Sequence, residues 1–438
     1  MTSGAAEPDF DVVVVGAGLA GSVAAYRLAE RGLSVVLIER GDVPGSKNLS
    51  GGVLYGRVLE SVFPDFANEA PVERRITRHV TTFLTPDSTV SLDYSADGLA
   101  EPVNAVTVLR AKFDPWLAGK AEEAGAFLMP EVRVDELLTE ASPGGPTVVG
   151  VRAGDDELRS RVVVAADGVN SFLATSVGLR HKPPTKHLAV GVKAVLALPR
   201  ADIESRFGVT GDRGAAHGIV GDCTLGIGGG GFLYTNTESL SVGVVLRLDD
   251  LLRSGRTAIE VFEHFTAHPG MQQYLRDGEL VEYGSHLVAE GGYRMVGEVA
   301  MNGLLVAGEA AGLAINSGLT VRGMDLAVGS AIAAADAVAE AVGNDDTSKQ
   351  GLGGYRRRLD EGFVIRDMRT YARAPAFLER PGMYGPYGKL AANVLHDVFS
   401  LDGTPRRHLI GVARRALKRS PVGIRQLISD GWAGVRAL

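Results

Sequence analysis

Cysteine is almost absent from this chain of 438 residues, in which Cys223 is the single example. One cysteine cannot build an internal disulfide framework or supply the ligands of a cysteine-bound iron–sulfur cluster. Its thiol is expected to be a small buried hydrophobic group rather than a redox centre. The nine histidines are scattered, and no HExxH or Ser/His/Asp arrangement accompanies them, so we expect no metal site and no nucleophilic triad.

Targeting signals and uninterrupted apolar runs are also missing. The first ten residues lack a basic start and an apolar core, so they predict no secretory signal. The most apolar helical window, 321–343, contains four charged residues and is not expected to span a membrane. The net charge of -7 argues against nucleic acid as a partner. These absences favour a cytoplasmic protein.

The strongest motif lies within residues 9–40. Four consecutive valines from residue 12 predict a strand that is buried on both faces of a parallel sheet. Gly16, Gly18 and Gly21 then form a GxGxxG turn into a helix, whose N-terminus can bind a pyrophosphate. Glu39 follows the second strand and would accept hydrogen bonds from both ribose hydroxyls of an adenosine. This spacing predicts a dinucleotide site that prefers FAD or NAD over NADP.

Other segments can contribute to the same site. The glycine pair at 51–52 offers bare backbone to a flat ring system, or is an ordinary surface loop before a short helix from Leu54 onward. Arg110 precedes a helix that we expect to begin through Asp114, with Pro115 at its first position. Its guanidinium could pair with a pyrophosphate or form a surface salt bridge.

Two later turns follow predicted buried strands. Asp167 lies in an Asp-Gly turn at a carboxyl edge, where open α/β sheets bind ligands. Glu309 follows a Gly-rich turn and could bind ribityl hydroxyls. Residues 318–320 are expected where a long Ala-rich helix begins, so that its N–H groups would stabilise negative charge on a flavin ring.

The segments GAGLAG, AADG and GEAAG resemble the flavoprotein class that includes aromatic hydroxylases and geranylgeranyl reductases. More narrowly, PGSKNLSGG, VLRAKFDPWLAGKAEEAGA, GGGFLYTN, SHLVAEGG and NSGLTVRGMDLA resemble the FixC-like flavoproteins, relatives of electron-transfer-flavoprotein:quinone oxidoreductase. The resemblance covers about residues 9–400. It implies an FAD-dependent dehydrogenase that receives electrons from an electron-transfer flavoprotein and passes them to a membrane quinone.

The resemblance also implies roles for individual residues. The FAD-binding positions are Gly16, Gly18, Ala20, Gly21, Glu39, Arg40, Arg110, Ala166, Asp167, Gly168, Gly308 and Glu309. The positions beside the isoalloxazine, where the flavin does the chemistry, are Lys47, Ser50, Gly51, Gly52, Gly318, Leu319 and Thr320. Two departures stand out, because the family pattern has Asp where this chain has Glu309 and Pro where it has Ala289.

Together with the resemblance, the single cysteine indicates which partner protein to expect. Quinone oxidoreductases of this kind carry a ferredoxin domain, which this chain cannot build, so a separate small ferredoxin-like iron–sulfur protein becomes the expected partner. Two other functions stay open: a flavin-dependent prenyl reductase, and a subunit that relays electrons without meeting quinone. For the quinone itself, the Gly-rich stretch 226–236 suggests a close backbone approach. Its candidate pocket residues, otherwise plain core positions, are Gly230, Gly231, Phe232 and Tyr234.

The C-terminal tail is basic and amphipathic. Residues 405–438 contain eight Lys or Arg and one Asp. In 408–419 the apolar residues fall on one helical arc and the basic ones on the other, and a second apolar face follows Pro421. Such helices can lie on an anionic membrane, or dock on the protein's own core or on a subunit. We expect peripheral association with the inner face of the cytoplasmic membrane.

The fold expected from these patterns is α/β, or α+β overall. It combines a Rossmann-type FAD-binding domain, a mostly antiparallel substrate domain and a helical C-terminal region. The FAD-binding domain is expected to be discontinuous, from 9–75, 104–182 and 298–345. Residues 76–103 and 183–297 form the substrate or quinone domain, and 346–438 form the C-terminal region.

Overall fold

The computed structural model describes residues 7–48 and 51–438. Its first layer is an eight-stranded sheet in which β17, β10, β1, β2 and β7 run parallel, while β16 pairs antiparallel with β17, and β9 joins β8 to β10. The strands are β1 (Phe10–Val15), β2 (Val35–Ile38), β7 (Phe127–Met129), β8 (Glu136–Glu140), β9 (Thr147–Ala153), β10 (Asp156–Ala165), β16 (Ala300–Met301) and β17 (Leu304–Val306).

The valine run of β1 is buried on both faces, as its sequence predicts. Val12 and Val14 pack in the cluster formed with helices α1, α4 and α10, while Val13 and Val15 pack in a second cluster on the other face of the sheet. The helices are α1 (Leu19–Ala29), α4 (Arg110–Glu123) and α10 (Met324–Gly343). By length and composition α10 could cross a membrane, but 67% of its apolar window is buried inside the protein.

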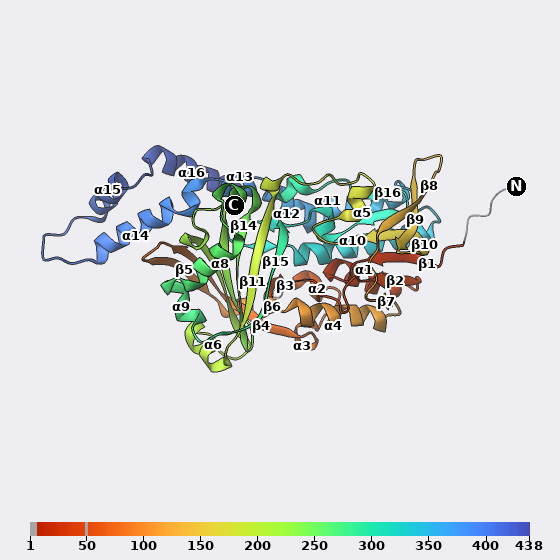
Figure 1. Cartoon of the computed structure of the whole chain (residues 1–438), viewed down its shortest axis with the longest axis horizontal. Helices are drawn as coiled ribbons and strands as arrows, with labels where there is room; N and C mark the ends of the chain where they lie inside the picture. Colours follow the sequence, from red (N-terminus) through yellow and green to blue (C-terminus); the bar gives the residue numbers. More distant parts are fainter. Residues whose placement is uncertain (1–6, 49–50) are drawn as a thin grey trace.

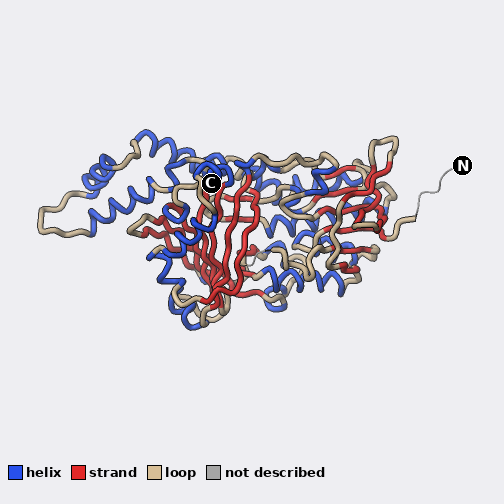
Figure 2. Tube along the Cα trace, viewed as in Figure 1, coloured by secondary structure: helices blue, strands red, loops and turns tan. Residues whose placement is uncertain are grey.

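A second, nine-stranded sheet lies beside this domain (Figures 1 and 2). All its pairings are antiparallel except that of β12 with β4, which confirms the mostly antiparallel expectation. One face packs against helices α6 (Arg200–Phe207), α7 (Leu248–Ser254), α8 (Ala258–Ala267) and α9 (Pro269–Leu275). The strands are β3 (Gly52–Tyr55), β4 (Val72–Leu84), β5 (Thr89–Ser95), β6 (Ala105–Val108), β11 (Leu188–Ala197), β12 (Arg213–Gly221), β13 (Gly229–Thr235), β14 (Ser239–Arg247) and β15 (Glu279–Ala289).

Several strands and helices contribute to a different domain from the one that the expected boundaries assign, or to both domains. Strands β3 and β6 fall in ranges assigned to the FAD-binding domain, yet they form hydrogen bonds within the second sheet. Side chains of both strands, Leu54 and Val108 among them, nevertheless pack in the core of the first domain. Helices α11 (Gly354–Glu361) and α12 (Phe363–Thr370) were expected in the C-terminal region, but Leu359 and Ile365 pack in that same core.

Two local predictions were wrong. Leu54 lies in β3 rather than in a helix, and the next helix is α2 (Arg57–Glu60), followed by α3 (Phe66–Glu69). Helix α4 begins at Arg110, not after Asp114, and contains Pro115. The Asp114 carboxylate binds the Arg110 guanidinium one turn earlier instead of capping the helix. This ion pair stabilises the first helical turn, from Arg110 to Asp114. The Asp-Pro dipeptide alone would place that turn outside the helix.

The C-terminal helices project from the end of the molecule opposite the N-terminus, where α14 and α15 reach furthest (Figure 1). They are α13 (Ala374–Leu378), α14 (Pro386–Phe399), α15 (Leu409–Arg419) and α16 (Ile424–Ala437). Both predicted tail helices are therefore present. Helix α15 packs on α14, and α16 packs on α13.

Candidate functional site

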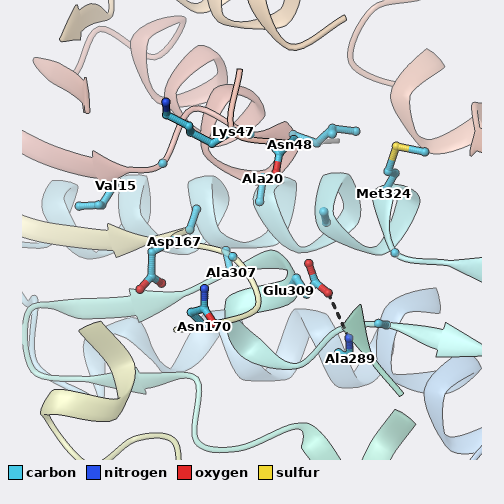
Figure 3. A pocket seen from close by; sticks show the side chains of 18 of the residues that line it. Val15, Ala20, Lys47, Asn48, Asp167, Asn170, Ala289, Ala307, Glu309 and Met324 are labelled. Carbon is cyan, nitrogen blue, oxygen red and sulfur yellow. Dashed lines mark hydrogen bonds between the residues drawn. The ribbon is translucent and has the colours of Figure 1, made fainter. Parts of the chain in front are cut away.

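A cavity of about 700 Å³ lies at the carboxyl edge of the parallel sheet and reaches the end of β15 and the start of α10. Figure 3 shows its walls, with Val15 and Asp167 toward one end and Met324 toward the other. The structure brings these predicted site residues together around it: Gly16, Gly18, Ala20, Glu39, Arg40, Lys47, Arg110, Ala166, Asp167, Gly168 and Glu309.

The glycines of the GxGxxG turn have two different roles. Gly16 and Gly21 are required by close backbone packing, whereas Gly18 faces the cavity. A Cβ at Gly16 would lie 2.5 Å from the Ala166 carbonyl oxygen, and one at Gly21 would lie 1.8 Å from the Gly16 carbonyl oxygen. A Cβ at Gly18 would meet only the Arg110 guanidinium, at 3.5 Å. Helix α1 begins there with no side-chain cap and no acidic residue in its first turn. Its N–H groups can therefore bind an anion in the cavity.

Two charged side chains flank this helix start. The Glu39 carboxylate accepts hydrogen bonds from the backbone N–H groups of Ala17 at 3.0 Å and Gly41 at 2.7 Å, which fixes its position at the end of β2. Arg110 forms a bidentate ion pair with Asp114, with both N–O distances 2.6 Å. Asp114 is fully buried, so the pair orients the guanidinium at the cavity wall.

The Asp167 turn offers an unused acceptor. One carboxylate oxygen accepts a hydrogen bond from the Leu173 N–H at 3.1 Å, while the buried Oδ1 has no partner among the described residues. Burial raises the pKa of this carboxyl above its usual value. A buried oxygen left without a partner is costly, so it favours a ligand that donates a hydrogen bond here.

Glu309 projects into the cavity, and its carboxylate accepts a hydrogen bond from the Ala289 N–H at 3.4 Å (Figure 3). Burial raises its pKa, although Arg110, Arg180 and Lys193 act in the opposite direction. The preceding Gly308 does not line the cavity and instead packs against Ala20 and Ala327.

The segment 318–320 is not the helix start that the sequence suggested. It is the turn of a small hairpin, β18 (Ile315–Asn316) and β19 (Val321–Arg322), and Leu319 is 67% exposed. Gly318, Leu319 and Thr320 are not among the cavity-lining residues. The positions that line the cavity at the true start of α10 are Arg322, Gly323 and Met324. They lie in the string NSGLTVRGMDLA, in which only residues 318–320 had a predicted role.

The glycine pair at 51–52 lies close to the cavity without lining it. A Cβ at Gly52 would contact the Met324 side chain at 3.0 Å, and one at Gly51 would collide with Ser241. These glycines allow β3 to pass between α10 and β14. Ser50 lies outside the described residues.

The proposed quinone residues lie on β13, away from the cavity lining. The ring that the backbone of Gly231 approaches is Phe265 of the same chain, 2.8 Å from where a Cβ would lie, and Gly230 packs against the Ile219 carbonyl oxygen. Phe232 and Tyr234 stack with ring centroids 5.0 Å apart. Packing within the chain thus accounts for both glycines, and a quinone role for these four residues stays a prediction.

Three half-buried groups near the cavity were missed from the sequence. Glu290 and Asn316 both line it. Lys193 lies on β11, with its ammonium 5.7 Å from the Phe232 ring centroid, and burial lowers its pKa to about 8. The EGG of the quoted string SHLVAEGG could have indicated Glu290, whereas nothing in the local sequence marks Lys193.

These residues fit FAD. An uncapped helix start with Gly18 and Arg110 matches a pyrophosphate, Glu39 matches an adenosine ribose, and the unpaired Asp167 oxygen matches a hydroxyl donor. The fold and the cavity define an FAD-dependent oxidoreductase, and residues 9–207 match the model of an FAD binding domain. When bound, FAD would supply the electron chemistry, and these residues would hold and orient it.

The chain belongs to the ETF-QO/FixC family, which confirms the resemblance seen in its sequence. Residues 374–438 match the model of the ETF-QO/FixC family C-terminal domain. The chain is 44% identical over 434 residues to the "Probable electron transfer flavoprotein-quinone oxidoreductase YdiS" of Escherichia coli K12, covering 98% of this chain and 99% of that protein. It is 45% identical over 437 residues to "Protein FixC" of Salmonella typhimurium, covering 99% and 100% of the two chains.

Solved structures share the fold at lower identity. A geranylgeranyl bacteriochlorophyll reductase-like protein of Thermoplasma acidophilum superposes with a TM-score of 0.70 and 21% identity, covering 96% of this chain and 98% of that one. A mutant of halogenase PltM in complex with FAD gives a TM-score of 0.62 at 13% identity, covering 97% and 85%. These structures support the α/β fold with its second sheet.

Proposed function

We propose that this protein takes electrons from an electron-transfer flavoprotein and passes them through FAD to a membrane quinone. The observation that carries the proposal is the full-length likeness to a probable electron transfer flavoprotein-quinone oxidoreductase, in a chain whose cavity joins the dinucleotide turn to the second sheet. The buried Cys223 thiol, whose pKa burial raises to about 12, is a poor redox group, which leaves the electron chemistry to FAD.

The test uses the full chain with bound FAD under anaerobic conditions. Reduced electron-transfer flavoprotein should bleach the flavin absorbance, and a short-chain quinone should restore it in the same cuvette. Bleaching without reoxidation by any quinone would favour an electron-relay subunit. Saturation of a prenyl double bond by the dithionite-reduced protein, without quinone reduction, would favour a prenyl reductase.

We also propose a separate small ferredoxin-like iron–sulfur protein as a partner. The single cysteine supports this, because the chain has no ligands for a cysteine-bound cluster of its own. Affinity purification of the native complex should yield stoichiometric iron, whereas the isolated chain should contain flavin and no iron. Stoichiometric iron in the isolated chain would contradict this partner.

The C-terminal helices support a peripheral site on the inner face of the cytoplasmic membrane. The tail side chains that they bury are mostly small, such as Ala416 and Ala437, while the predicted apolar face is left in solvent, with Ile428 67% exposed. The large exposed apolar residues of this region are Leu395, Phe399, Leu401, Leu409, Ile410, Ile424, Leu427, Ile428, Trp432, Val435 and Leu438. With eight Lys or Arg in residues 405–438, this surface suits an anionic bilayer.

Vesicle flotation tests this membrane site. The full chain should float with anionic vesicles and much less with zwitterionic ones, and a double change of Leu409 and Ile410 to Asp should abolish flotation. The matched control is Leu252→Asp on α7, since Leu252 is 66% exposed on a different element. Equal flotation of the double variant and the control would contradict the proposal.

A further inference from the structure

Glu290 is a carboxyl group at the cavity wall, placed directly after β15. The side-chain amide of Asn316 donates hydrogen bonds to its two oxygens, at 3.4 and 3.2 Å. The backbone N–H of Glu290 donates a hydrogen bond to the His187 carbonyl oxygen at 2.9 Å, which fixes the backbone at this position. The carboxyl is thus oriented by neutral partners, and no ion pair to it is found in residues 7–48 and 51–438.

The charges around Glu290 leave its proton easy to gain and to lose. Burial raises the pKa of Glu290 to about 7, against the Asn316 hydrogen bonds and the charge of Arg247. The Arg247 guanidinium pairs with Asp249 at 2.9 Å and also with Asp250, which offset its charge. Burial, together with the charge of Glu290, raises the pKa of Tyr384 to about 12, so the phenol stays protonated.

Glu309, the other acid at the cavity wall, has a different environment. Its carboxylate accepts a backbone hydrogen bond, and three cations, Arg110, Arg180 and Lys193, favour its charged form. Glu290 has one partly neutralised cation and a neutral amide. A group that exchanges a proton near neutral pH must not be locked in either state, so Glu290 is the better suited of the two.

Tyr384 connects this site to the C-terminal region. It ends a short 3-10 helix, Pro381–Tyr384, and its hydroxyl donates to the Leu378 carbonyl oxygen. The backbone N–H of Gly229, at the start of the Gly-rich strand, acts to lower the pKa of this phenol. The Glu290 carboxyl at the cavity wall is therefore coupled electrostatically to a hydroxyl of the C-terminal region.

We propose that Glu290 is the acid that delivers a proton to the quinone during its reduction in this cavity, an inference that rests on the proposed function. Quinone reduction requires two electrons, which come from the reduced electron-transfer flavoprotein through FAD, and two protons. For one of these protons, the O–H bond of Glu290 breaks as an O–H bond forms on a quinone carbonyl oxygen. The carboxylate then regains a proton from solvent, which also supplies the second proton.

The test compares Glu290→Gln with the wild type, using the full chain with FAD reduced by one equivalent of dithionite. Stopped-flow reoxidation by a short-chain quinone should slow at least about tenfold in the variant, the size usual for loss of a general acid. Reoxidation by ferricenium, a one-electron acceptor that takes no proton, should be unchanged. Glu290→Asp should recover part of the quinone rate, and the matched control Glu298→Gln, an exposed ion-pair residue, should behave as the wild type.

A second measurement needs no turnover. In the FAD-free protein, the infrared carbonyl band of a protonated carboxyl should titrate near neutral pH in the wild type and be missing from Glu290→Gln. Equal slowing with both acceptors, or an unchanged quinone rate, would overturn the proposal. A wild type that reduces ferricenium and no quinone would instead refute the proposed function, and a missing infrared titration would refute the role of Glu290 independently.

Discussion

Glu309 and Ala289 contact each other through a hydrogen bond from the Ala289 N–H to Glu309 Oε1, across 3.4 Å. They are also the two positions at which the family resemblance of the sequence implies other residues, Asp and Pro. Proline has no N–H to donate, and aspartate is one methylene shorter. The glutamate side chain and the backbone N–H of Ala289 are thus both needed for this contact.

A double-variant cycle tests this coupling. Glu309→Asp leaves the Ala289 N–H without its partner, and Ala289→Pro leaves the Glu309 carboxylate without its donor, so each should weaken FAD binding by about 1 kcal/mol. The double variant should bind FAD more tightly than the two single losses predict, with a coupling of about 1 kcal/mol. Titration of the apoprotein with FAD, followed by fluorescence quenching, measures it. Strictly additive losses would show that the two departures are independent.

The glycines of the dinucleotide turn should separate folding from binding. Gly21→Ala would place a Cβ 1.8 Å from the Gly16 carbonyl oxygen, so it should destabilise the apoprotein by more than about 2 kcal/mol. Gly18→Ala meets only a side-chain nitrogen at 3.5 Å, so apoprotein stability should change by less than about 0.5 kcal/mol while FAD affinity falls at least tenfold. Urea unfolding and FAD titration measure the two effects. Tight FAD binding by Gly18→Ala would contradict the assignment of the phosphate site.

The Arg110–Asp114 pair offers a similar separation. Among the described residues, Arg110→Met leaves the fully buried Asp114 carboxylate with only the Asn48 amide, at 3.3 Å, and should cost about 3 kcal/mol of stability. Adding Asp114→Asn removes the unpaired charge and should recover most of that stability. FAD affinity should stay low in the double variant, because the guanidinium beside Gly18 is still missing. Recovery of both properties would mean that Arg110 serves the fold alone.

Much of the parallel domain could be predicted because its signals are local. The buried valines of β1, the glycine spacing and Glu39 each act within a few residues, and backbone sterics dictate their arrangement. The order of segments around the cavity followed from the rule that ligands bind at the carboxyl edge of such sheets.

The errors arose where side-chain pairing or very short strands override the signals of single residues. The Asp-Pro dipeptide predicted a helix start at Asp114, but Asp114 instead forms an ion pair with Arg110 inside the helix. The turn at 318–320 belongs to a hairpin with two residues in each strand, too short for an alternating pattern to show. Glu290 acquires its environment from Asn316 and Tyr384, which are far from it in sequence, so no local pattern could reveal it.

Stability should fall in mild acid because of His217, which is 3% exposed on β12 between the rings of Phe207 and Tyr274. Burial, assisted by the charge of Arg78, lowers its pKa to about 4. In the unfolded chain the imidazole has a pKa of about 6.5 and takes up a proton first. The stabilising contribution of neutral His217 is thus fully present above pH 6.5 and is lost as the pH falls toward 4, by about 3 kcal/mol in total.

His217→Phe should remove this part of the pH dependence, since a phenyl ring can occupy the same aromatic site without titrating. Urea unfolding of the apoprotein at several pH values between 4.5 and 7.5 measures the slope of the unfolding free energy for both proteins. The matched control is the exposed His181, whose replacement by Phe should leave the slope as in the wild type. If His217→Phe and the wild type lose stability in parallel as the pH falls, the acid sensitivity must come from groups other than His217.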